Sequence, residues 1–182
     1  ADLDTFLADP SALESLAQAY VNTPEFAQTV RDMYAEALLV RKVSGGLPAA
    51  GAFDGFTRME RERAMSEEAL ALIETVVMND SPFTEVVTAD WTVLDEAAAT
   101  MWADHTYDFE ELGEQVVDWT DGRPSAGVLT TNSMLVRWES AGGNYNRGRA
   151  NMVSRVFLCE SFAGRDIPID GSVDLSDPLM VA

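Results

Sequence analysis

Apolar residues recur every three or four positions through most of this chain, and this spacing limits its fold more than any other feature. The longest periodic stretch runs from Thr57 to Asn79 and includes Met65, Leu70 and Ile73. Such spacing places apolar side chains on one face of an α-helix. The sequence therefore predicts a mainly α fold, an irregular bundle of about six to eight helices with long loops, room for one short β-pair and an extended C-terminal tail.

Two helices are predicted near the N-terminus. The first is capped by Asp9 or Ser11, and the second follows Thr23, with Pro24 at its first helical position. The apolar stripe of the first helix consists of Leu13, Leu16, Ala17 and Tyr20. We therefore expect the chain to start with a pair of short helices separated by a break.

The chain is expected to form three parts. Residues 1–44 are the N-terminal helical pair, and residues 57–165 are a main helical domain that packs with the pair as one unit. Residues 166–182 are rich in Pro, Gly and Asp and are predicted to be an extended acidic tail or connector. Within the main domain, residues 92–105 are predicted to be helical, and residues 114–119 allow a short strand.

The charge of the chain is strongly negative and unevenly spread. The formal net charge is -19 over 182 residues, and residues 1–122 contain 25 acidic but only 6 basic side chains. An acidic body repels nucleic-acid phosphates and anionic lipids, so we expect neither as a partner. No apolar run approaches the roughly 18 residues that suggest a membrane-spanning helix, so the chain is not expected to be transmembrane.

Few residues offer catalytic or metal-binding chemistry. The single cysteine, Cys159, allows neither an internal disulfide nor, alone, a zinc site. Its place at an apolar helix end predicts a small buried side chain. The single histidine, His105, is a weak candidate for a catalytic acid–base residue beside Asp104 and Asp108. A cap or a surface residue is the more usual role of such a histidine.

The last predicted helix begins in a segment that gathers arginines in an otherwise acidic chain. We expect Arg147, Arg149 and Arg155 to clamp this segment to carboxylates of the acidic body, because arginine forms bidentate pairs with carboxylates. The alternative is a site for an anion or an acidic ligand beside Asn144 and Asn146.

The tail contains a weak calcium candidate. Its alternating oxygen ligands are Asp170, Ser172, Asp174 and Asp177. This spacing faintly resembles a calcium-binding loop, but the following Gly and the distal Glu of such a loop are missing. A solvated acidic connector is the alternative.

Several segments resemble large secreted proteins of planctomycetes and myxobacteria. "SAGVLTTNSMLVRW", "NYNRGRANMVSRVFLCESF" and "DIPIDGSVDLSDP" resemble a Gly-Val-Leu-Thr helix start, an Asn-Arg-x-Arg helix with a Phe-Leu-Cys end, and a Pro-rich acidic tail. "NDSPFTEVVTADWTVLDEAAATMW" and "YVNTPEFAQTVRDMYAEAL" are similar to earlier segments of the same proteins. The chain thus resembles the domain-of-unknown-function families numbered 1592 and 1588.

The resemblance implies export to the periplasm or the cell surface, often beside a cytochrome c-like C-terminal part. The Cys-x-x-Cys-His motif that attaches haem is absent from this sequence. No cofactor is therefore expected in this chain apart from the calcium candidate of the tail. Any haem c is expected in a missing C-terminal part or in a partner. The resemblance implies no catalytic residues.

We therefore expect a non-catalytic structural or interaction module of an exported protein or complex. Its partner would be another protein or further domains of the same precursor. One alternative is an extracellular hydrolase that uses Asp and Glu carboxylates, which two carboxylates at glycosidase spacing in a deep cleft would favour. Another is a calcium- or anion-binding module.

Overall fold

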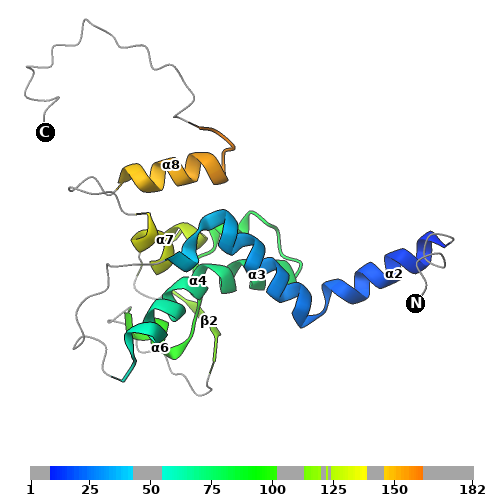
Figure 1. The fold of residues 1–182 in the computed structure, drawn as a ribbon, viewed down its shortest axis with the longest axis horizontal. Coiled ribbons are helices and arrows are strands. Elements are labelled where there is room, and N and C mark those ends of the chain that lie inside the picture. The colour runs from blue at the N-terminus through cyan, green and yellow to red at the C-terminus, as the bar shows by residue number, and fades with distance from the viewer. Residues whose placement is uncertain are drawn as a thin grey trace, which may run out of the picture.

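The structure is a computed structural model that describes residues 9–42, 55–101, 113–119, 122, 124–138 and 146–161. These residues form seven α-helices, two short 3₁₀ helices and one two-stranded sheet (Figure 1). In chain order the elements are α2 (Pro10–Val21), α3 (Pro24–Leu38), η1 (Val40–Lys42), α4 (Arg58–Met78), α5 (Glu85–Thr88), β1 (Trp91–Leu94), α6 (Glu96–Met101), β2 (Gln115–Asp118), η2 (Gly127–Thr130), α7 (Asn132–Arg137) and α8 (Asn146–Val156). The predicted mainly α fold with one short β-pair is confirmed.

Helix α4 is the axis of the fold, because α3, α5, α6, α7, β1, η1 and η2 all pack against it. It begins with a capping box: the Thr57 hydroxyl accepts from the Glu60 amide (3.3 Å), and the Glu60 carboxylate accepts from the Thr57 amide (2.7 Å). Residues on several sides of the helix are buried, including Met65, Leu70 and Ile73. A helix with buried residues on several sides lies inside the core and not along its edge.

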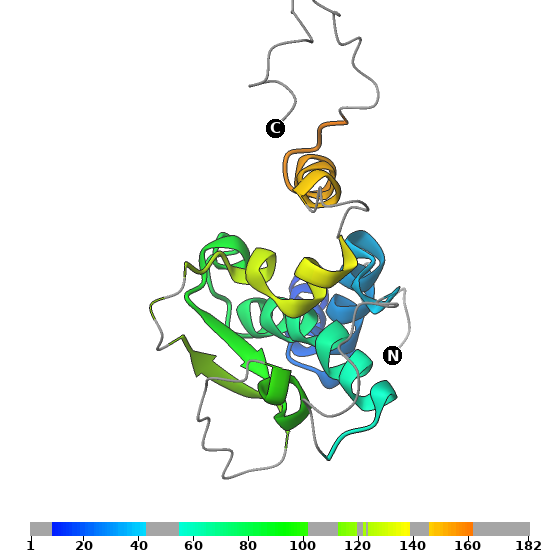
Figure 2. The same cartoon turned by 90° about the vertical axis from the view of Figure 1, so that its left-hand side faces the viewer.

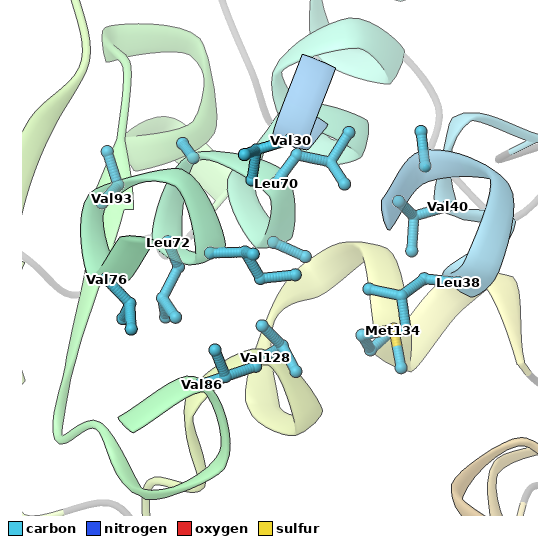
Figure 3. Close-up of a cluster of buried hydrophobic side chains, with 14 of the residues drawn as sticks. Val30, Leu38, Val40, Leu70, Leu72, Val76, Val86, Val93, Val128 and Met134 are labelled. Atoms are coloured by element: carbon cyan, nitrogen blue, oxygen red, sulfur yellow. The ribbon is translucent and has the colours of Figure 1, made fainter. Parts of the chain in front are cut away.

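The main core lies between α4, the end of α3 and the η2–α7 segment (Figure 3). Its labelled members are Val30, Leu38, Val40, Leu70, Leu72, Val76, Val86, Val93, Val128 and Met134. A smaller cluster around Leu94 and Ala98 joins α4 and α6 to the sheet. Each large apolar side chain that is fully buried stabilises the fold by about 1.5–3 kcal/mol, so this core is the main source of stability.

The sheet consists of β1 and β2 in antiparallel pairing, with Trp91 opposite Asp118 and Leu94 opposite Gln115. The strand predicted at residues 114–119 is therefore present as β2. β1 is largely buried, whereas partly buried and exposed positions alternate along β2, as expected for a strand with one face in solvent.

The helix predicted over residues 92–105 is wrong at its start. Thr92 and Val93 belong to β1, and α6 begins only at Glu96. β-branched residues fit a pleated strand when a partner strand is present, and β2 supplies that partner. The Asp95 carboxylate then begins the helix by accepting a hydrogen bond from a backbone amide of α6 (2.7 Å).

The two N-terminal helices begin where the sequence predicts. Asp9 is the N-cap of α2, and its carboxylate accepts from the Ser11 amide (3.0 Å). Thr23 caps α3 through its hydroxyl, which accepts from the Phe26 amide (3.2 Å). Helix α2 projects away from the body of the described structure (Figure 1), and the Tyr20 and Phe26 rings meet edge-on at the junction, 5.6 Å apart.

The start of the η2–α7 segment is held close to α5. Gly127 has a φ of +51°, and its amide donates to the Ala89 carbonyl (3.0 Å). A Cβ atom at Gly127 would lie 2.1 Å from the Val86 carbonyl oxygen. The position therefore requires glycine both for its left-handed backbone and for the close approach of α5.

The end of α7 is attached to the end of α3. Arg137 Nε donates to the Leu39 carbonyl, and Trp138 Nε1 donates to the Leu38 carbonyl, both at 3.1 Å. These donors satisfy carbonyls that the C-terminal end of α3 leaves without partners inside the helix, and the arginine charge is favourable there.

Helix α8 lies on the side of α7 that faces away from α4, so α7 lies between α4 and α8 (Figures 1 and 2). Met152 is buried in the core, and Val153, Val156 and Phe157 pack against it. The predicted three-part division of the chain stays a prediction, because the tail lies outside the described residues. Among the described helices, none combines the length and hydropathy that a bilayer crossing requires.

Candidate functional site

Arg31 on α3 is the centre of a charged cluster that joins α3, α4 and the residue before β2. Its guanidinium pairs with Glu67 (Nη1 to Oε2, 3.3 Å), with Glu74 and with Glu114. The pair with Glu114 is bidentate, since Nη1 also donates to Oε1 of Glu114 at 2.9 Å. The Arg31 side chain is only 15% exposed, so its burial depends on these carboxylates.

The cluster raises the pKa of Arg31 above its usual value. Burial by itself lowers this pKa, because the charged form is disfavoured away from water. Hydrogen bonds to Glu114 and Glu74, together with their charges, raise it by more. Arg31 therefore stays charged at acidic and neutral pH.

Arg41 on η1 extends the cluster along α3 and α4. It pairs with Glu67 (2.9 Å from Nε to Oε1) and with Asp32 (2.6 Å from Nη1 to Oδ1). The hydrogen bond with Glu67, and then that with Asp32, raises the pKa of Arg41. The bond from Arg41, and then one from Gln28, lowers the pKa of the exposed Asp32 carboxyl.

A cavity of about 340 Å³ lies beside the cluster, and its charged lining consists of Arg31, Arg41, Arg63, Glu67, Asp95 and Glu114. A second hollow of about 290 Å³ shares Arg41, Arg63 and Glu67 with it. The volume suits a small ligand. Arginines hold Glu67 and Glu114, however, and an amide of α6 holds Asp95. The arrangement is therefore best suited to joining α3, α4 and β2.

Glu68 is a buried carboxylate on α4, only 1% exposed. One of its oxygens accepts from the amide of Asn132, the first residue of α7 (2.8 Å), and the other accepts from the Thr92 hydroxyl on β1 (3.3 Å). The N-cap residue of α7 is Thr131, but its side chain makes no capping hydrogen bond to the helix. Glu68 performs this role from another helix, and its charge faces the positive end of α7.

Helix α2 offers a surface of a different kind. None of the described side chains from Ser11 to Val21 is buried. Leu13 is 53% exposed, and Leu16 and Tyr20 are each 48% exposed. Together with Ala17 they form the predicted stripe, which stays largely exposed apart from the edge-on contact between the Tyr20 and Phe26 rings. A contiguous exposed apolar surface marks an interaction site more than scattered apolar residues do.

Most of the predicted site residues lie outside the described part of the chain. They are His105, Asn144, Asp170, Ser172, Asp174 and Asp177. The catalytic histidine and the calcium site therefore stay predictions. Within the ranges that the structure covers, no group of three or more His, Cys, Asp or Glu side chains is arranged to hold a metal ion.

The arginines of the last helix are placed in part. Arg149 Nη2 donates to the Leu135 carbonyl on α7 (2.7 Å), so it attaches α8 to α7 through a backbone carbonyl. The predicted clamp to carboxylates stays a prediction. Arg155 is exposed and forms no ion pair within the described residues. Asn146 and Arg147 lie in the first turn of α8, where only their backbone is described. The alternative of an anion site there stays a prediction.

The prediction that Cys159 is buried is wrong. Helix α8 ends at Val156, and Cys159 is exposed beyond it with a left-handed φ of +53°. The turn is closed by two hydrogen bonds: the Glu160 amide donates to the Ser154 carbonyl (2.8 Å), and the Ser154 hydroxyl donates to the Glu160 carbonyl (2.9 Å). A left-handed residue after the last turn is a common way to end a helix.

Arg31 and Glu68 are not among the site residues predicted from the sequence. Glu68 has a signal, because it lies between Met65 and Leu72 on a face that is otherwise apolar. A charged residue in such a position indicates a buried partner. Arg31 has no comparable signal, since its partners lie 36, 43 and 83 residues away in the sequence.

Comparison with known protein families identifies the family of this chain. The family model described as "PSD4: Protein of unknown function (DUF1592)" matches residues 3–103, more than half of the chain. The match extends from α2 to α6 and so includes the exposed helix. No curated protein and no solved structure matches the chain. The resemblance to family 1592 is confirmed and that to family 1588 stays a prediction: the chain belongs to the DUF1592 family.

Proposed function

We propose that this chain is a non-catalytic interaction module of an exported protein or complex, and that it binds a protein partner through α2. The observation that carries the proposal is the exposed apolar stripe of Leu13, Leu16 and Tyr20 on a helix that projects from the body (Figure 1). Because the family match includes α2, the helix belongs to the family's shared unit.

The charged residues of the body support this proposal over an enzymatic one. Arg31 and Arg41 hold their carboxylate partners in ion pairs, and Glu68 caps α7. A general acid or base must be free to gain or lose a proton during the reaction. These carboxylates are instead used to hold secondary-structure elements together.

The test is the size of the complex in the organism that makes the protein. The full chain, carrying Leu16→Asp or the matched control Gln18→Asp, is recovered without denaturation, and its native mass is compared with that of the parent. We expect the parent and the control to migrate in a larger complex and Leu16→Asp to migrate alone with an unchanged melting temperature. A parent chain that migrates alone contradicts the proposal.

The proposal places the module in the periplasm or outside the cell, beside a cytochrome c-like electron-transfer part. The family resemblance supports this placement. Covalent haem survives denaturing electrophoresis, so a haem stain of the recovered complex tests it. A stained band larger than this chain is expected. A complex without haem removes the electron-transfer role and leaves the interaction intact.

An extracellular hydrolase is the second candidate, favoured by the cavity that Glu67, Asp95 and Glu114 line. Polysaccharide hydrolysis by the purified chain, lost in Asp95→Asn and Glu114→Gln variants that still fold, would place this function first. Absence of turnover across a panel of extracellular polysaccharides contradicts it.

A further inference from the structure

We infer that α2 is a preformed helical ligand, which inserts its apolar face into a groove on a different protein, a groove with an apolar floor and a basic rim. This inference rests on the proposed function and names the chemistry of the partner that the function requires. It assigns the binding residues to one face of one helix.

The spacing of the exposed residues matches this mode of binding. Leu13, Leu16, Ala17 and Tyr20 occupy positions i, i+3, i+4 and i+7 of α2. Helices that bind in grooves use anchors at this spacing, because it aligns them along one face. Ser15 and Gln18 lie on the opposite face, so the helix has an apolar side and a polar side.

The helix is held in its folded form at both ends. Asp9 caps its start by accepting from both the amide and the hydroxyl of Ser11 (3.0 and 2.7 Å). Pro10 occupies the first helical position, and the Asn22 side chain donates to the Gln18 carbonyl at the other end (2.7 Å). A helix of this length is marginal in isolation. Capping reduces the ordering that a partner would otherwise have to impose, which favours binding.

A second copy of this chain is a less suitable partner for α2 than a different protein. The exposed parts of Leu13, Leu16 and Tyr20 offer on the order of 300 Å² together, well below the roughly 800 Å² per partner of a stable interface. A pair of α2 helices side by side buries little more than these stripes. A groove also covers the flanks of the helix. Two copies of a chain with a net charge of -19 repel each other as well.

The charge of the molecule determines the rim of the groove. Glu14 is the only charged residue within Pro10–Val21, so the helix itself is complementary to a groove with an apolar floor. The surrounding molecule is strongly acidic, with Asp9 and Glu25 flanking α2. A partner that approaches it meets a negative potential, and basic residues around its groove turn that potential into attraction.

The experiment places a photo-activated cross-linking amino acid at position 16, or at position 18 as the matched control on the opposite face. The full chain is cross-linked in the organism that makes it, and the joined peptide is identified by mass spectrometry. We expect position 16 to join an apolar segment of a different protein, flanked by Lys or Arg, and position 18 to give at most a trace. Cross-links to a second copy, to residues 1–8 or 162–182 of the same chain, or equally from both positions overturn the inference.

Affinity measurements with the partner so identified complete the test. Leu16→Asp should weaken binding by at least about 30-fold, the loss that corresponds to a hot-spot residue, whereas Gln18→Asp should stay within about 3-fold. Raising the salt concentration should slow association with the parent chain. Equal effects of the two substitutions contradict binding in a groove through the apolar face. An association rate that does not depend on salt contradicts the basic rim.

The outcomes separate the inference from the function on which it rests. A native complex that Leu16→Asp leaves intact overturns the inference but keeps the interaction module, with another surface as its binding site. A chain that forms no complex at all removes both. Unchanged melting temperatures of the two variants show that neither result arises from unfolding.

Discussion

Helices α4 and α2 use the same kind of residue in opposite environments. Leu72 of α4 is completely buried among side chains from several elements, whereas Leu16 of α2 is 48% exposed. Both helices are capped at their starts, so the difference does not arise from local structure. It arises from what surrounds each helix. An apolar face shows that a helix needs a cover, and the described chain provides one only for α4.

The largest expected effect comes from matched leucine truncations in the two helices. Leu72→Ala should lower the free energy of unfolding by about 2–5 kcal/mol, because it removes transfer energy and leaves a cavity. Leu16→Ala should change it by less than about 0.5 kcal/mol, as an exposed substitution does. Urea denaturation of both variants measures the difference. Equal losses would mean that α2 is part of the folded core.

A glycine pair examines how closely the body is packed. Gly127→Ala should cost about 2–4 kcal/mol, since its left-handed φ is unfavourable for alanine and the new Cβ collides with the Val86 carbonyl oxygen. Gly122→Ala has a φ of +70° but no atom within 4 Å, so only the backbone cost of about 1–2 kcal/mol applies. Melting temperatures of the two variants distinguish these costs. Similar shifts would contradict the close approach of η2 and α5.

An arginine pair compares the partly buried cluster with the surface. Arg31→Gln should lower the unfolding free energy by about 1–3 kcal/mol, because it leaves three glutamates without their shared partner. Arg58→Gln removes an exposed pair with Glu62 on α4 and should cost less than about 0.5 kcal/mol. If high salt abolishes the Arg31 effect as readily as the Arg58 effect, the cluster contributes no more than a surface pair.

The smallest of these effects on stability is expected at low pH, from the pair of Asp32 and Arg41 in the body. The pKa of Asp32 is lower in the folded protein than in the unfolded chain, chiefly because of the hydrogen bond from Arg41. The resulting stability is present above the unfolded pKa of about 3.9 and is lost as pH falls through the folded value. Denaturation curves between neutral and low pH should therefore show a shallower acid loss for Asp32→Asn. An identical acid loss would show that this pair is not formed in solution.

Local signals in the sequence predicted the helices but not their neighbours. Thr23 and Pro24 mark the start of α3, and the apolar spacing after Thr57 marks α4, because caps and periodicity act within a few residues. β1 was not separable from the following helix, since its partner β2 comes later in the chain. The position of Cys159 depends on where α8 ends, which periodicity alone does not determine.

The α2 stripe and the Arg31 cluster differ in the same way in how well the sequence predicts them. The stripe of α2 was predictable because all its members lie within one helix. The Arg31 cluster was not, because three separate segments must first fold before Glu67, Glu74 and Glu114 meet one side chain. The exposure of α2 was likewise not predictable, since it depends on the arrangement of the whole chain.

The hydrogen bond between Glu68 and the Asn132 amide ties folding to the order of synthesis. The two residues are 64 positions apart, so at about 5–20 residues per second the ribosome adds Asn132 roughly 3 to 13 s after Glu68. During that interval the buried carboxylate lacks one of its hydrogen bonds, and a buried polar group that misses a hydrogen bond costs stability. The nascent chain should therefore keep α4 partly solvated until α7 emerges. The residues matched by the family model, which end at 103, should depend on later residues to complete their core.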